Sequence, residues 1–185
     1  YSNLTGAANT GVGQRALFTN STGNGNTALG YQTLNLNTTN NNVAIGASAL
    51  NSNTTASNNT AVGYQAGYSN QTGTRGTFVG YQSGYSNLEA DNTAFGYDSL
   101  YSNTYGNYNT ALGRSALRNN TTASNNTAVG YQAQYSGTTG TANTSLGYAA
   151  LKANVSTSYN TAVGYAAMRD GNGGGDCAAF GFAAL

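Results

Sequence analysis

The chain repeats one short pattern of apolar and polar residues from end to end. A glycine recurs eleven times, with an apolar residue before it and most often a tyrosine after it, as in the NTAVGYQA of residues 126–133. Neighbouring glycines are 16 or 17 residues apart. A fixed period of this size predicts identical structural units stacked along one axis. The central glycines are Gly13, Gly30, Gly46, Gly63, Gly80, Gly96, Gly113, Gly130, Gly147, Gly164 and Gly181.

The residues that lead up to each glycine favour a β-strand. In Thr-Ala-Val-Gly, the Thr and Val side chains would point to one face and Ala to the other. The β-branched Thr and Val suit a strand. The residues after the glycine, Tyr-Gln-Ala-Leu-Tyr, can form a second short strand, and the glycine permits the bend between the two. The Asn-, Ser-, Thr- and Gly-rich remainder is typical of turns, and we expect the one-residue length differences there.

These elements predict an all-β fold, a parallel β-solenoid of about eleven coils of 16–17 residues each. Helical repeats generally need more than about 30 residues, and the regular Gly and Asn residues would interrupt a helix. Coils stacked about 4.8 Å apart would give a rod roughly 48 Å long. We expect residues 1–185 to form a single repeat array. Since the chain starts and stops within a repeat, we interpret it as a fragment of a longer fibrous protein.

The residue before the glycine is apolar in every repeat, so we predict that it forms the structural core. Thr shares its face and is therefore also expected to point inward. Ala and the other small residues would allow several rods to pack closely side by side, as a homotrimer or another bundle. The predicted core residues are Val12, Leu29, Ile45, Val62, Val79, Phe95, Leu112, Val129, Leu146, Val163 and Phe180.

The composition argues against several classes of function. Only 6% of the residues are charged and the net charge is +1, so no basic patch supports nucleic-acid binding. No apolar run is long enough to insert into a membrane. The chain has no His and one cysteine, Cys177, which we expect to be a buried or half-buried small residue. The run from Asp170 to Asp176 faintly resembles a calcium loop but lacks the final Glu. We expect no catalysis, no cofactor and no metal site.

The tyrosines recur at fixed positions and are the candidate binding residues. Tyrosine rings one repeat apart could bind glycans by ring stacking, with neighbouring Gln such as Gln132 donating hydrogen bonds. The alternative is that the rings stack on one another along the rod. A row of threonines could bind ice, although an inward-pointing row argues against this. The candidate glycan contacts are Tyr64, Tyr81, Tyr97, Tyr131, Tyr148 and Tyr165.

Two stretches carry a resemblance to known families. Residues 42–46 (NVAIG) resemble the head repeat of YadA-type trimeric autotransporter adhesins, and residues 59–68 (NTAVGYQAGY) resemble repeats of phage tail fibres and large bacterial surface proteins. The adhesin resemblance implies a trimeric, left-handed parallel β-roll with its coil axis along the fibre. The adhesin repeats are typically shorter than the 17 residues seen here.

The sequence therefore favours a structural shaft or head segment of an extracellular fibre that supports attachment. Such a segment would lie on a bacterial cell surface as an adhesin or on a virion as a tail fibre. Its partner would be itself, as a homotrimer or other rod bundle, without nucleic acid or membrane insertion. The alternative is a module that binds cell-surface glycans through the Tyr row or, less favoured, ice through the Thr row.

Overall fold

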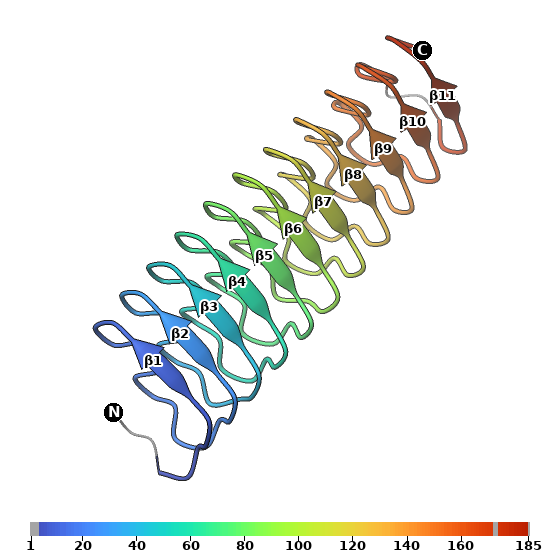
Figure 1. Ribbon diagram of the computed structural model, residues 1–185. Helices are drawn as coiled ribbons and strands as arrows, with labels where there is room; N and C mark the ends of the chain where they lie inside the picture. Colours follow the sequence, from blue (N-terminus) through green and yellow to red (C-terminus); the bar gives the residue numbers. More distant parts are fainter. Residues whose placement is uncertain (1–3, 172–173, 185) are drawn as a thin grey trace.

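The chain forms one elongated β-solenoid, seen here in a computed structural model that describes residues 4–171 and 174–184 (Figure 1). Eleven three-residue strands pair in parallel into a single sheet, in chain order from β1 to β11, and the described ranges contain no helix. The predicted all-β parallel solenoid is confirmed. The strands are β1 Thr10–Val12, β2 Thr27–Leu29, β3 Val43–Ile45, β4 Thr60–Val62, β5 Thr77–Val79, β6 Thr93–Phe95, β7 Thr110–Leu112, β8 Thr127–Val129, β9 Thr144–Leu146, β10 Thr161–Val163 and β11 Ala178–Phe180.

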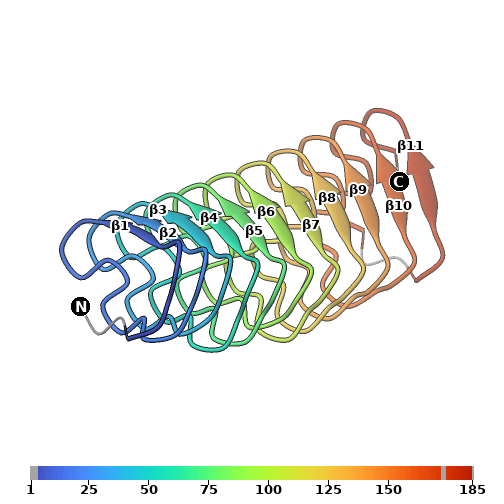
Figure 2. The ribbon, with the colours of Figure 1, turned by 60° about the horizontal axis from the view of Figure 1, so that its bottom comes forward.

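Equivalent residues of successive repeats lie side by side. Between β7 and β8, for example, Thr110 pairs with Thr127 and Leu112 with Val129. The coils follow one another as near copies along the rod (Figure 2). Because every strand pair keeps this register, any residue type that recurs in the sequence becomes a continuous row on the rod or inside it.

Each coil has one strand, and the predicted second strand is wrong. The second and fourth residues after the glycine lie in the left-handed region, as at Ser115 (φ 57°) and Leu117 (φ 49°). Backbone hydrogen bonds still join these turns to both neighbouring coils. The Leu50 N–H donates to the Ala66 carbonyl at 3.0 Å in the next coil, while the Gln82 N–H donates to the Tyr64 carbonyl at 2.9 Å in the preceding one.

The strands face the opposite way from the sequence prediction. The middle strand residue points inward: Ala111 and Ala128 are fully buried, as is the leucine four residues after the glycine, such as Leu117. The predicted core residues instead line the outer face. Val12, Leu29, Ile45, Phe95, Leu112, Leu146 and Phe180 are exposed, and Val62, Val79, Val129 and Val163 are half-buried. The Ala rows therefore lie inside one rod and cannot mediate contact between rods.

The reason for this reversal is the small cross-section of the coil. Leucines from the turn, such as Leu100 and Leu117, already fill the apolar half of the interior. Only a methyl-sized side chain fits opposite them, because protein interiors pack closely and tolerate little excess volume. The alternation of side chains was predicted correctly, with Thr and the apolar residue on one face. That face is the outside.

Buried asparagines hold the polar half of the interior. Asn109 Oδ1 accepts the backbone N–H of Asn126 in the next coil at 3.0 Å, and Asn109 Nδ2 donates to the Ala123 carbonyl at 2.8 Å. Asn120 Nδ2 donates to that same carbonyl at 3.0 Å. One asparagine side chain thus pairs backbone groups that would otherwise be buried without partners. This explains why Asn occupies two fixed positions in most repeats.

The shorter repeats lose their residue in a turn, as predicted. In a 17-residue repeat, Asn20 Nδ2 donates to the carbonyl of Gly23, three residues on. In the two 16-residue repeats, the equivalent bonds reach only two residues on, from Asn37 to Thr39 at 3.0 Å and from Asn87 to Glu89 at 2.7 Å. The deletion shortens the turn beside the buried asparagine and leaves the strand register unchanged.

Candidate functional site

The six candidate tyrosines form a ladder along the rod. Tyr64, Tyr81 and Tyr97 stack with ring centroids 5.3 and 4.9 Å apart. Farther along, the rings of Tyr131, Tyr148 and Tyr165 stack at 5.2 and 4.8 Å. We call these six residues, with Phe182 at 5.1 Å beyond Tyr165, the first aromatic ladder. The structure thus brings together every tyrosine that the sequence singled out.

An arginine bridges the two halves of this ladder. Arg114 occupies the tyrosine position of its repeat, with its guanidinium carbon 5.3 Å from the Tyr97 ring centroid and 5.9 Å from that of Tyr131. A cation over an aromatic face is attractive, so the stack continues through Arg114. The series of phenol rings is interrupted there, because Arg114 carries no hydroxyl-bearing ring.

A second aromatic ladder runs beside the first. The rings of Tyr68, Tyr85 and Tyr101 stack 5.1 Å apart, with interplanar angles of 4° and 11°. Arg118 ends this series 5.0 Å from the Tyr101 ring and also binds Asp98 at 3.2 Å. Loss of water around the stacked rings raises the pKa of Tyr81 and Tyr85, and their neighbouring phenols add to the effect. Both side chains therefore stay neutral at neutral pH.

The stacking leaves little open ring face for a glycan to bind. The six candidate rings are 38–50% exposed, yet each inner ring has both faces covered by neighbours. A sugar binds aromatic residues best on an open ring face, and the ladder offers mainly ring edges and hydroxyls. One pair of glutamines beside the rings is also bonded across coils, since Gln82 Nε2 donates to Gln65 Oε1 at 2.7 Å. The stacked rings therefore make most of their face contacts within the rod.

The outer face of the sheet is the larger candidate surface. It carries two parallel rows, the threonines that begin the strands and the apolar residues that end them. Leu112 and Leu146 are 44% and 45% exposed and Phe95 is 51% exposed, while Thr93, Thr127 and Thr144 also face outward. The expectation that the Thr row points inward is therefore wrong. We call these two rows the outer sheet face.

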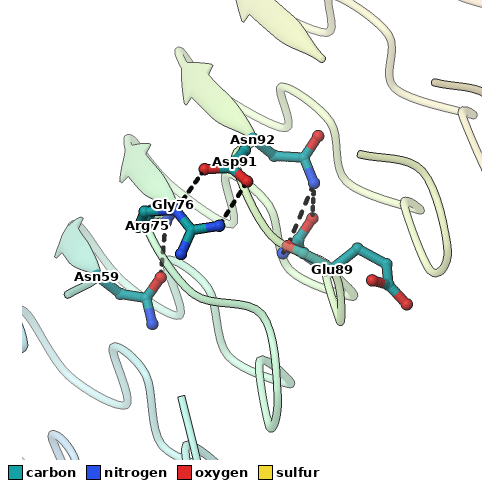
Figure 3. Close-up of polar contacts among 7 residues, drawn as sticks. Asn59, Arg75, Gly76, Glu89, Asp91 and Asn92 are labelled. Carbon is teal, nitrogen blue, oxygen red and sulfur yellow. Dashed lines mark hydrogen bonds and ion pairs between the residues drawn. The ribbon is translucent and has the colours of Figure 1, made fainter. Parts of the chain in front are cut away.

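Three Arg–Asp ion pairs lie between or within coils of the described ranges. Arg75 points toward Asp91 of the next coil (Figure 3). Its Nε and one terminal nitrogen donate to the two carboxylate oxygens at 2.7 and 2.8 Å. The hydrogen bond and charge of Arg75 hold the pKa of Asp91 below its ordinary value. In the same view the Gly76 N–H donates to Asn59 Oδ1 at 2.7 Å. Because the Arg75 side chain is exposed, the ion pair adds little stability.

The acidic and cysteine side chains of the described ranges are dispersed along the rod. Within residues 4–171 and 174–184, no three His, Cys, Asp or Glu side chains gather where they could hold an ion. Part of the faint calcium loop, residues 172–173, lies outside the described residues. Cys177 is half-buried, as predicted, and packs against the last apolar cluster of the interior. The same ranges offer no helix suited to crossing a bilayer.

The fold and its surfaces define this chain as a repetitive parallel β-solenoid, with rows of identical side chains inside and out. Comparison with protein-family models, with curated proteins and with solved structures found no match.

Proposed function

We propose that the chain is a structural shaft or head segment of an extracellular fibre, in a phage tail fibre or a bacterial surface adhesin. The outer sheet face is the observation that carries this proposal. It presents an unbroken row of apolar side chains on all eleven strands, from Val12 to Phe180. Exposed apolar surface of this extent is typical of an interaction site. A rod bonded coil to coil, with one long apolar side, suits side-by-side assembly into a stiff fibre.

The partner that fits the outer sheet face best is another copy of the same rod. Each copy carries the same two rows at the same spacing, so copies match along their whole length. Three rods with this face turned to a common axis would bury all the apolar rows at once. Burial of such surface is the main favourable term in protein association. A homotrimer is therefore the assembly that we propose.

Charging the outer sheet face should separate the rods without unfolding them. We expect the chain of 18.8 kDa to sediment as a trimer, and the Leu112→Asp/Val129→Asp double variant to sediment as a monomer. Both side chains lie outside the coil, so the circular dichroism of the variant should match that of the parent. An unpaired charge buried in an interface costs several kcal/mol. Sedimentation equilibrium across a concentration series measures the change.

The matched control places the same two charges elsewhere on the rod. Thr122 and Thr139 are exposed in turns outside the sheet, so Thr122→Asp/Thr139→Asp should remain trimeric. A monomeric parent chain, or a Leu112→Asp/Val129→Asp variant that still forms trimers, would contradict assembly through this face. A parent monomer would leave the Thr row open to water and favour ice binding as the second candidate function. Thermal hysteresis of the monomer would then be the decisive measurement.

A shaft should carry no activity on the first aromatic ladder. Replacing Tyr131 and Tyr148 with Phe keeps the rings stacked and removes only two hydroxyls. Attachment of the fibre to cells or glycans should then be nearly unchanged. If the ladder binds glycans, each lost hydrogen bond should cost about 0.5–1.5 kcal/mol, multiplied over repeated sites. A large fall in glycan-array binding by a folded variant would support the glycan-binding alternative instead.

A further inference from the structure

The aromatic ladders hold phenol rings in contact at fixed pairs. Within each tyrosine pair the ring centroids lie 4.8–5.3 Å apart and the planes are within 22° of parallel. The six tyrosine rings of the first ladder are also 38–50% exposed, so a small oxidant can reach them. The partner of each ring is a second tyrosine held in place by the coil stacking.

Other tyrosines are more exposed but lack such a partner. Tyr105, Tyr108 and Tyr159 are 63%, 61% and 65% exposed, and among the described residues no aromatic ring stacks on any of them. The more exposed tyrosines of the chain are therefore not the ones that stack in pairs. Any reaction that needs two adjacent phenols should select the ladders, whereas one that needs only access should select these three.

We propose that the two aromatic ladders are sites of oxidative tyrosine coupling, which joins successive coils by dityrosine bonds. The co-reactant is a peroxide, used through a peroxidase or a photosensitiser. Each of two neighbouring tyrosines loses one electron and its hydroxyl proton. The two phenoxyl radicals form a carbon–carbon bond between their Cε atoms. The coupled carbons then lose their protons, and the two oxygens regain protons.

The electrons and atoms balance in this step. The two tyrosines together lose two electrons and two protons, and the peroxide O–O bond accepts the two electrons. Hydrogen peroxide thereby becomes two waters, and persulfate becomes two sulfates with release of the two protons. The rings must tilt to bring their Cε atoms together, and exposed side chains change rotamer within picoseconds to nanoseconds.

The ladders define which bonds should form and which should not. Coupling is available at Tyr131–Tyr148 and Tyr148–Tyr165, where both rings carry hydroxyls. It is unavailable between Tyr97 and Tyr131, because Arg114 lies between their rings. It also stops at Phe182, which stacks on Tyr165 without a phenol. Each bond would tie one coil to the next and resist separation of the coils under load.

Peptide mapping of the oxidised 185-residue chain tests this proposal. The chain is photo-oxidised in dilute solution with a ruthenium tris-bipyridyl sensitiser and persulfate, then digested with trypsin, which cleaves after Arg and Lys. Tyr148 lies in the peptide 119–152 and Tyr165 in the peptide 153–169. We expect these two peptides to be joined by dityrosine within single chains, which keep the mass of one chain on a denaturing gel.

Two conservative variants separate pairing from exposure. Tyr148→Phe should abolish the joined product of peptides 119–152 and 153–169. Tyr159→Phe alters the more exposed tyrosine in the second peptide and should leave that product unchanged. The product should also disappear when the chain is oxidised in guanidinium chloride, which separates the coils. The proposal fails if the product survives Tyr148→Phe or unfolding, if Tyr159→Phe removes it, if Tyr97 couples to Tyr131 as readily, or if no dityrosine forms.

Discussion

Replacing Phe78 with alanine should destabilise the rod by about 3–5 kcal/mol, the usual cost of an emptied aromatic core position. Phe78 is the one bulky residue in the inward-facing strand row and is fully buried in β5. It fits because the turn residues around it are glycines where most other coils have leucine. A Cβ added to Gly84 would lie 2.5 Å from Phe78 Cε1, and one added to Gly67 would lie 2.9 Å from Phe78 Cδ2.

Leucine in place of Gly84 should destabilise the parent rod but stabilise the Phe78→Ala variant. Gly84→Leu alone should cost more than the usual overpacking penalty of about 1–3 kcal/mol, because its side chain would overlap the ring. In the Phe78→Ala background, the introduced leucine would instead fill part of the cavity and restore the Ala–Leu pairing that the neighbouring coil makes with Ala94 and Leu100. The backbone already suits leucine, since Gly84 (φ 58°) and Leu100 (φ 51°) share one conformation.

A double-mutant cycle by denaturant unfolding measures this coupling. We expect the Phe78→Ala/Gly84→Leu variant to be more stable than either single variant. The recovery should be partial, because the half of the cavity beside Gly67 stays empty. Additivity of the two single effects would show that Phe78 and Gly84 do not share one volume. That result would contradict the account of the interior as a space of fixed cross-section.

Gly113→Ala should be severely destabilising for a different reason, the approach of two backbones. Gly113 has φ of 130°, a conformation that L side chains rarely adopt. A Cβ there would also lie 2.6 Å from the carbonyl oxygen of Gly130 in the next coil. The backbone strain alone costs about 1–3 kcal/mol, and relief of the clash would separate the coils. Thermal and denaturant unfolding should both show the loss.

Gly11 provides a matched control with the opposite expected sign. It occupies the inward strand position that is alanine in most coils, and an added Cβ would meet Leu17 Cδ1 at an ordinary 3.5 Å. Gly11→Ala should therefore be neutral or stabilise the rod by about 0.4–1 kcal/mol through reduced freedom of the unfolded chain. Similar losses for Gly11→Ala and Gly113→Ala would contradict a specific role for the central glycine.

The period of the array and its parallel stacking follow from the sequence alone. Glycines 16 or 17 residues apart leave room for one coil and too little for two helices. When equivalent residues of successive coils stack, any recurring side chain forms a row along the rod. The stacked tyrosine ladders could therefore be predicted from the sequence, as the alternative to glycan binding. The deleted residues before Thr39 and Glu89 could also be placed in turns, because a solenoid keeps its strands in register.

The turns could not be predicted in the same way. Leu117 and Gln132 adopt left-handed backbone conformations (φ 49° and 53°) that their residue types rarely choose locally. Hydrogen bonds to the coils above and below hold them there, and such bonds exist only after stacking. Local preference therefore indicated a second strand where the neighbouring coils impose a turn.

Only the tertiary structure decided which side of the strand is the inside. Alternation along Thr127, Ala128 and Val129 separates two faces but is equally consistent with either one inward. Hydrophobicity alone favours Val129 as the buried side chain. Ala128 is buried instead, because leucines and asparagines from the turns leave room only for a small side chain. The sequence by itself determined that the chain is a stack of equivalent coils with matching rows. The packed interior determined which rows lie inside the coil and which remain on its outer face.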